Sequence, residues 1–240
     1  MHRLTYIVTA FDRDGRWLAL NESLENYEKY DPALLDHIRF VIVDDCCPEP
    51  VRLDKEYDLN LTILRVDTDI PWNQGGARNL GVDYARTDRV LLTDMDFFFP
   101  EKTLQGAMTG PLAENELRRF RRTTKISGTG SSPHNIFLMH KKRFMQVGGV
   151  DEIFAGHYGF EDVFFVQQQK EQKAKFTCSD DCCLFLLYKD EKESSDPSVG
   201  RDFSHNRALM EGKTTHSGTF LNFEWSVVLD KTRSTAAKGV

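Results

Sequence analysis

The chain lacks any apolar run approaching the roughly 18 residues that a membrane-spanning helix needs. Residues 1–15 contain only a short apolar stretch followed at once by charged residues, which is not the pattern of a signal peptide. Basic residues are in deficit, with 31 Lys and Arg against 37 Asp and Glu and a net charge of −6. This balance excludes the strongly basic surface of a nucleic-acid-binding protein. We therefore expect neither a transmembrane segment nor a nucleic-acid partner.

Cysteine is scarce and does not suggest a disulfide framework. The five cysteines stand at positions 46, 47, 178, 182 and 183, so their number is odd and two pairs are adjacent. Together with the lack of a signal peptide, this pattern indicates reduced thiols and a cytoplasmic location. A Gly-x-Gly-x-x-Gly sequence is also missing after the first apolar run, which disfavours a Rossmann dehydrogenase.

The first half of the sequence alternates short apolar, β-branched runs with helical segments. We expect strands at 4–10, 39–45, 61–67 and 89–96, and helices within 16–30 and 72–86. Nearly continuous apolar strands separated by helices predict an α/β domain with a parallel sheet covered on both faces. Ligands bind such a sheet beyond the carboxyl ends of its strands.

The second half is less regular. It predicts strands at 135–140 and 183–188, and helices at 141–147, 161–171 and 203–211. Residues 189–204 are polar and rich in turn-forming types, which is typical of a long loop. The stretch 118–122 (RRFRR) is interpreted first as a solvated helix face. No linker divides the chain, so we expect one domain over 1–233 and a frayed tail at 234–240.

Two carboxylates follow the strand expected at 89–96. Residues i and i+2 of an extended segment point to the same side, which would place Asp94 and Asp96 together. Carboxylate oxygens at a strand end suit a hard divalent cation such as Mg²⁺ or Mn²⁺, which usually also takes phosphate oxygens as ligands. The pair lies between a buried strand and an aromatic run, which favours a site over a solvated turn.

Three further groups of polar residues accompany this pair. Asp44 and Asp45 end the second strand and suit either hydrogen bonds to a base or ribose, or a turn. The run 74–79 (QGGARN) offers glycines, free helix N–H groups and the charge of Arg78 for a phosphate, or else is a plain helix start. Glu161 and Asp162 follow clustered glycines at another helix start, where the helix dipole favours charged carboxylates.

In this order the pieces resemble the glycosyltransferase family 2-like group, which has the GT-A fold. The resemblance spans about 6–165 and rests on four stretches: 7–14 (IVTAFDRD), 41–49 (VIVDDCCPE), 74–100 (QGGARNLGVDYARTDRVLLTDMDFFFP) and 148–165 (GGVDEIFAGHYGFEDVFF). The last stretch is similar to the galactosyltransferase and chondroitin-synthase subgroup, with Tyr158 where that subgroup has tryptophan. The family often has YNR where this chain has FDR, and small polar residues or glycine where it has Cys46 and Cys47.

The resemblance implies a role for each matching residue. It places a nucleotide-binding half at 1–100 and an acceptor half at 101–233. It implies contacts to the nucleotide sugar from Thr9, Ala10, Phe11, Asp44, Asp45, Gln74, Arg78 and Asp94. It implies a metal on Asp96 and His205, acceptor contacts from Glu161 and Tyr158, and a catalytic base at Asp162. Residues 189–204 would then form a lid, and the arginines at 118–122 have a second interpretation as an acceptor or phosphate contact.

The resemblance also implies the reaction. We expect a Mn²⁺- or Mg²⁺-dependent, inverting glycosyltransferase that moves a sugar from a nucleotide diphosphate sugar, by family default a UDP-sugar, to a hydroxyl of a glycan or other acceptor. A retaining glycosyltransferase is the nearest alternative. A nucleotidyltransferase, suggested by the phosphate-loop-like residues 127–130, and a non-catalytic nucleotide- or carbohydrate-binding module are the others.

Overall fold

The computed structural model describes residues 2–13, 15, 17–123, 135–185 and 202–234. Within these residues the strands form a single sheet of nine, in the order β5-β8-β6-β7-β4-β1-β2-β3-β9. Its central part is the parallel set β3-β2-β1-β4. Their bounds are β1 Leu4–Ala10, β2 Ile38–Asp44, β3 Leu61–Val66 and β4 Arg89–Asp94.

The flanks of the sheet are mixed. β7 runs antiparallel to β4, β6 antiparallel to β7, β8 parallel to β6 and β5 antiparallel to β8. At the other edge β9 runs antiparallel to β3. The bounds of these strands are β5 Phe97–Phe98, β6 Glu116–Thr123, β7 Phe137–His140, β8 Lys175–Phe185 and β9 Trp225–Lys231.

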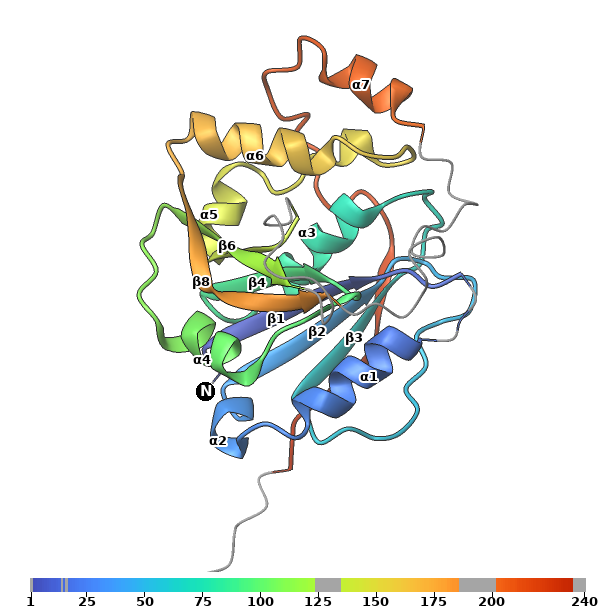
Figure 1. Ribbon diagram of the computed structural model, residues 1–240. Coiled ribbons are helices and arrows are strands. Elements are labelled where there is room, and N and C mark those ends of the chain that lie inside the picture. Colours follow the sequence, from blue (N-terminus) through green and yellow to red (C-terminus); the bar gives the residue numbers. More distant parts are fainter. Residues whose placement is uncertain (1, 14, 16, 124–134, 186–201, 235–240) are drawn as a thin grey trace, which may run out of the picture.

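Helices cover both faces of the sheet (Figure 1). One face carries α1 Leu18–Tyr27, α2 Pro32–Leu35 and α4 Glu101–Thr109. The other carries α3 Gln74–Tyr84, α5 Lys141–Gln146 and α6 Glu161–Glu171. A 3₁₀ turn, η1 Glu152–Phe154, precedes α6, and α7 Ser204–Met210 lies beyond it.

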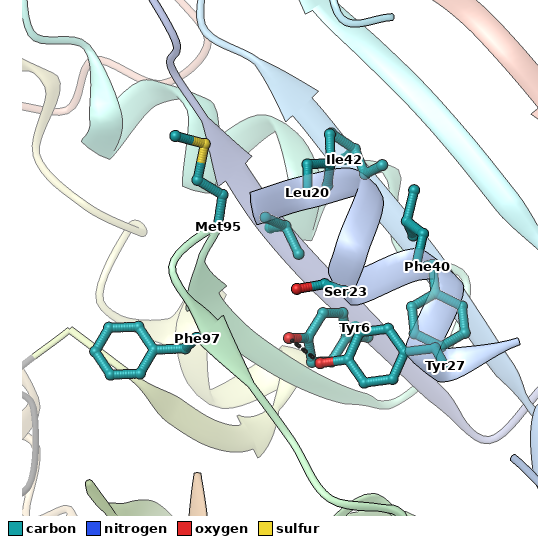
Figure 2. Close-up of a pocket in the computed structure, with 10 residues that line it drawn as sticks. Tyr6, Leu20, Ser23, Tyr27, Phe40, Ile42, Met95 and Phe97 are labelled. Atoms are coloured by element: carbon teal, nitrogen blue, oxygen red, sulfur yellow. Dashed lines mark hydrogen bonds between the residues drawn. The ribbon is translucent and has the colours of Figure 1, made fainter. Parts of the chain in front are cut away.

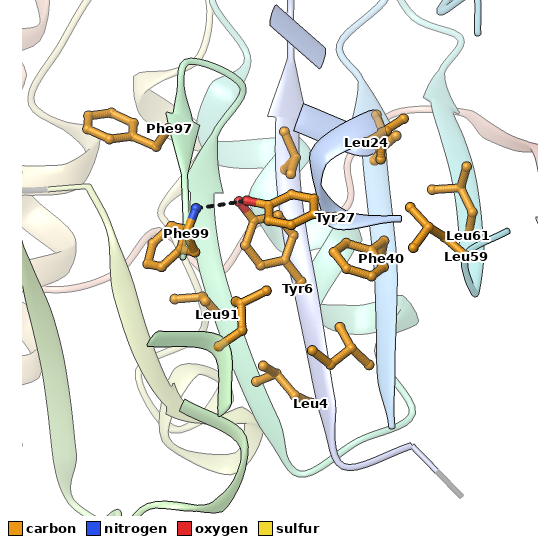
Figure 3. Packing of buried hydrophobic residues seen from close by; sticks show 14 of the residues in the cluster. Leu4, Tyr6, Leu24, Tyr27, Phe40, Leu59, Leu61, Leu91, Phe97 and Phe99 are labelled. Carbon is orange, nitrogen blue, oxygen red and sulfur yellow. Dashed lines mark hydrogen bonds between the residues drawn. The ribbon is translucent and has the colours of Figure 1, made fainter. Parts of the chain in front are cut away.

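The strands divide their side chains between two cores. On β1, Tyr6 and Val8 join the core beneath α1, whereas Ile7 joins the core beneath α3, as alternation along a strand requires. Tyr6 and Tyr27 share a hydrogen bond of 2.9 Å between their hydroxyls, and the backbone N–H of Phe99 donates to the Tyr27 hydroxyl over 3.0 Å (Figure 3). The hydroxyls are therefore satisfied inside an apolar layer.

A small cavity lies in the same core, between α1 and the sheet. Figure 2 shows its lining, which includes Tyr6, Ser23, Phe40 and Met95. Its volume of about 10 Å³ is no larger than one water molecule requires, so it is a packing defect and not a ligand site.

Most predicted elements are confirmed, and three expectations are corrected. Residues 118–122 belong to strand β6 and not to a helix. Leu117 is buried in the core on one face of the sheet and Phe120 in the core on the other, as an extended chain between strands β8 and β7 allows. The strand expected at 183–188 begins at Lys175. Met95 and Asp96 form a turn, so Asp94 and Asp96 are not paired by extended alternation.

The single α/β domain with a parallel central sheet is confirmed. Among the described residues, none of the helices has the length and apolar character needed to cross a membrane. Residues 127–130, most of the expected lid at 189–204, and the tail from 235 onward lie outside the described residues.

The close packing of α3 on β1 predicts a stability effect at Gly81. A Cβ there would lie 2.4 Å from Cγ2 of Ile7 and 3.2 Å from Cγ2 of Val43. We expect Gly81→Ala to lower the free energy of unfolding by about 1–3 kcal/mol, because this overpacking outweighs the helix propensity of alanine. Urea denaturation measures it. Asp83→Ala, at an exposed position of the same helix, is the control and should change stability by less than about 0.5 kcal/mol. Equal stability of Gly81→Ala and the native chain would contradict this packing.

Candidate active site

Sheet register brings the first site residues together. Thr9 pairs with Asp94 across β1 and β4, and Ala10 pairs with Asp44 across β1 and β2, so three strands end at one edge. Asp94 Oδ1 accepts hydrogen bonds from Thr9 Oγ1 (3.4 Å), Gln74 Nε2 (2.9 Å) and Arg78 Nη2 (2.7 Å). Asp94 Oδ2 accepts one from Asn135 Nδ2. Four of the predicted nucleotide-sugar contacts therefore form one cluster.

Helix α3 delivers Gln74 and Arg78 from one face, because residues four positions apart lie one above the other. The glycines between them serve packing: a Cβ on Gly75 would lie 2.8 Å from Val150 Cγ1, and one on Gly76 2.7 Å from the Phe223 ring. These contacts seat the start of α3 against the segment before α6, which holds Val150, and the segment before β9, which holds Phe223. Packing alone therefore accounts for glycine at positions 75 and 76, without the close approach to a ligand that the sequence suggested.

Asp44 and Asp45 have different surroundings, although both end β2. Asp44 is buried and accepts from the backbone N–H groups of Cys47 and Val51 and from Arg65 Nη1, at 2.9, 3.1 and 2.6 Å. Its oxygens are engaged within the protein. Burial raises the pKa of Asp45 to about 7, against an opposing effect of Asn73. Asp45 is thus the carboxyl of the two that is left for a ligand.

The remaining residues of the first strand end border the same edge. The Ala10 carbonyl accepts from the backbone N–H of Asp45 at 3.0 Å, which ties the ends of β1 and β2 together. Phe11 follows with 42% of its surface exposed, so its ring is open to a flat ligand such as a base.

A second group of residues gathers at the start of α6. Trp72 packs edge-to-face on Tyr158, with ring centroids 4.5 Å apart, and its Nε1 donates to Glu161 Oε1 over 3.4 Å. Glu161 is buried, and its Oε2 has no hydrogen-bond partner among the described residues. Burial and the charge of Asp162 raise the pKa of Glu161, whereas Arg78 opposes this shift. Arg78, which forms an ion pair with Asp94 in the first cluster, therefore also acts electrostatically on Glu161 in the second.

Asp162 stands beside Glu161 in the first turn of α6. It is partly exposed, and its Oδ1 accepts from the backbone N–H of Val163 at 2.7 Å. Its other oxygen has no protein donor recorded within the described part of the chain, so it is open to a proton-bearing ligand. Asp162 lies at the N-terminal, positive end of the α6 dipole.

The loop before α6 is held by α7. Asn206 is fully buried, and its Nδ2 donates to the carbonyls of Phe154 (3.0 Å), His157 (2.9 Å) and Gly159 (2.7 Å). His205, one residue earlier, is exposed and stacks on His157 with 3.7 Å between ring centroids. The amide of Asn206 thus sets the path of the backbone that leads to Tyr158 and Glu161.

A divalent metal has few preformed ligands here. Within the described residues, no group of three or more His, Cys, Asp or Glu side chains is arranged to hold an ion. Asp96, in the turn after β4, is one partly buried carboxylate. Mg²⁺ and Mn²⁺ sites of this kind need only one or two carboxylates when waters and substrate phosphates complete the shell. Asp96 therefore fits a metal that arrives with a diphosphate, and the role of His205 stays a prediction.

Sequence reasoning missed Asn135, Asn206 and Trp72. Each is a single polar or aromatic residue outside a periodic pattern, and its partner lies 41 to 89 positions away. The arginines at 118–122 were singled out in the sequence, but they were expected on a helix and lie on strand β6. Of the three, only Trp72 could have been found from the sequence, because it lies two residues before the glycine-containing start of α3.

Comparison with known proteins gives one curated relative and several similar solved structures. No protein-family model matches the chain. An uncharacterized glycosyltransferase of Haemophilus influenzae is 35% identical over 102 residues, which cover 41% of this chain and 31% of that protein. The chain thus spans about a third of that relative's length.

Solved structures show the fold. S. aureus TarS (residues 1–349) aligns with a TM-score of 0.58 and 17% identity over 77% of this chain and 60% of that one. The catalytic domain of Drosophila β1,4-galactosyltransferase 7, in complex with xylobiose, aligns with a TM-score of 0.58 and 14% identity over 92% and 83%. A Pyrobaculum calidifontis mannosyltransferase, in complex with GDP-Man and Mn²⁺, aligns with 0.57 and 18% over 79% and 58%. The GT-A fold expected from the sequence is confirmed.

The three bonds of Asn206 predict a local effect of its removal. Asn206→Ala should speed amide hydrogen exchange at 156–160 by roughly tenfold or more, because each lost bond contributes about 1 kcal/mol to holding the loop. Hydrogen-exchange mass spectrometry measures it, with Arg207→Ala, exposed on the same helix, as the control. Unchanged exchange in the loop, or an equal rise throughout the protein, would show that Asn206 does not hold this loop in particular.

Proposed function

We propose that this chain is a metal-dependent, inverting glycosyltransferase that moves a sugar from a nucleotide diphosphate sugar to a hydroxyl of a glycan or other acceptor. The observation that carries this proposal is the convergence of Thr9, Gln74, Arg78 and Asn135 on Asp94, at the carboxyl ends of the parallel strands of a GT-A sheet. Ligands of open α/β sheets bind at this edge. The name of the Haemophilus influenzae relative supports the same activity.

The donor would lie over the ends of β1, β2 and β4. Phe11 and Asp45 are assigned to the base and ribose, and Arg78 to the diphosphate, since a guanidinium matches phosphate geometry. A uridine nucleotide is favoured because TarS was solved with UDP-GlcNAc and with UDP, and the Drosophila enzyme with manganese and UDP-Gal. Asp96 would hold the cation, which would supply neutralisation of charge on the departing diphosphate.

The acceptor would lie against Trp72, Tyr158 and Glu161. Asp162 takes the proton of the acceptor hydroxyl as its oxygen attacks the anomeric carbon. A new C–O bond forms, the bond to the diphosphate breaks on the opposite face, and its electron pair leaves with the diphosphate. The buried Oε2 of Glu161 is available for a hydrogen bond with another acceptor hydroxyl. A cytoplasmic location stays a prediction.

Nucleotide binding tests the donor half. Thermal shift with UDP, GDP, CDP and dTDP, each with and without Mn²⁺, should show stabilisation by one nucleotide that depends on the metal. At a nucleotide concentration of 100 Kd, the gain is about 2.7 kcal/mol. Asp96→Ala should lose the metal-dependent part, whereas Glu114→Ala, an exposed acid before β6, should keep it. No shift with any nucleotide would contradict the proposal.

Turnover tests the base. Asp162→Asn should lower kcat by about 10²–10⁴-fold, because general-base catalysis typically contributes that much. Its nucleotide-dependent thermal shift should stay that of the native chain, since Asp162 lies on the acceptor side. Glu114→Gln serves as the control for the loss of one exposed carboxylate. Transfer by Asp162→Asn at the native rate would remove the assignment and favour a retaining mechanism, which needs no such base.

A further inference from the structure

Arg119 of β6 is a partly buried arginine without a polar partner. Its guanidinium lies over two aromatic rings, 5.4 Å from the centroid of Phe137 and 5.1 Å from that of Phe176. Among the described residues it makes no hydrogen bond and no ion pair, and its Nε is buried with no acceptor. The rings hold the plane of the group but satisfy none of its N–H donors.

This makes Arg119 an exception in the described part of the molecule. Every other buried or partly buried arginine there donates to a carbonyl, an amide oxygen or a carboxylate: Arg39, Arg65, Arg78, Arg89, Arg118, Arg143 and Arg233. A desolvated donor left without an acceptor costs free energy, and more so when it is charged. The terminal Nη atoms of Arg119 are not among the buried atoms without a partner, so these are the donors that an acceptor from outside the chain can reach.

The surroundings of Arg119 connect it, through one aromatic ring, to the helix that carries the proposed base. Phe137, beneath its guanidinium, also packs on Phe165 of α6 with 6.0 Å between centroids. Asp162 stands one turn earlier on that helix. Burial lowers the pKa of Arg119, and electrostatic interactions with Cys178 and Asp162 oppose this shift, although the guanidinium makes no ion pair with Asp162. Arg119 therefore borders the acceptor side of the site.

We propose that Arg119 binds an anionic group of the acceptor, a carboxylate or a phosphate, beside the hydroxyl that Asp162 deprotonates. The proposal rests on the proposed function, because Asp162 defines the acceptor side. A guanidinium presents paired N–H donors that match a carboxylate or phosphate, and its charge strengthens both hydrogen bonds. The acceptor is thereby assigned to the acidic sugars or sugar phosphates, and Arg119 discriminates against neutral ones.

The test compares three defined probes: methyl β-glucuronide, glucose 6-phosphate and the neutral methyl β-glucoside. Their dissociation constants are measured by NMR titration on the native chain, on Arg119→Gln and on Arg119→Lys. Arg86→Gln is the matched control, because it removes the same charge from an exposed arginine that lies over the Tyr84 ring at the far end of α3. The Nε–H resonance of Arg119 is followed directly, and its absence in Arg119→Lys assigns it.

The native chain and Arg86→Gln should bind one anionic probe at least about tenfold more tightly than methyl β-glucoside, with a shift of the Arg119 resonance. Which probe binds distinguishes the carboxylate from the phosphate. Arg119→Gln should lose the preference and keep the nucleotide-dependent thermal shift, and Arg119→Lys should keep part of the preference. Equal binding of neutral and anionic probes by the native chain, or a preference kept by Arg119→Gln, would overturn the proposal.

Two further outcomes separate this proposal from the one it rests on. If Arg119→Gln loses the nucleotide-dependent thermal shift, the anion at Arg119 belongs to the donor, and the acceptor assignment is wrong. If the native chain shows no nucleotide shift yet binds an anionic probe through Arg119, the anion site stands and the transferase proposal fails.

Discussion

The carboxylate of Asp94 and the guanidinium of Arg78 depend on each other, and the arrangement of the site depends on both. Arg78 is buried, and a buried charge without its partner is strongly destabilising. Because Thr9 and Asn135 donate to the same carboxylate, one charge joins the ends of β1 and β4, the start of α3 and the segment before β7. Arg78 also opposes the rise in the pKa of Glu161, so one guanidinium acts on both Asp94 and Glu161.

Much of the fold was predictable because its central strands are continuous apolar runs with clear breaks. The helix at 161–171 was located residue for residue, since two acids mark its start and polar residues its end. The prediction of a helix at 118–122 was wrong because four arginines in five residues suggest a solvated helix face, whereas two of them are accommodated within the sheet. Arg118 pairs with Glu116, and Arg119 lies over aromatic rings. The rings over Arg119 come from β7 and β8, and a single sequence does not show which strands are neighbours.

The candidate site was predictable where local spacing decides geometry. Gln74 and Arg78 share a helix face however the helix packs in the fold. The carboxyl ends of parallel strands always meet at one edge of the sheet. Asp44 and Asp45 were indistinguishable in the sequence because the difference between them is made by Arg65, a residue of another strand. The pairing of Asp94 with Asp96 was inferred from an extended chain, and the turn at Met95 removes that premise. Asn206 acts through three carbonyls, and a carbonyl has no signature in a sequence.

The edge strand β9 has a consequence for how this protein folds. It completes the sheet next to β3, and Thr62 donates to Asp230 across a separation of 168 residues, while Arg39 binds the carbonyl of Lys231. During synthesis the hydrogen-bonding edge of β3 stays open until residues 225–231 have left the ribosome. Such non-local pairing raises contact order and slows folding. A chain truncated before residue 225 would therefore leave the outer edge of β3 unpaired, and such an edge invites association with other strands.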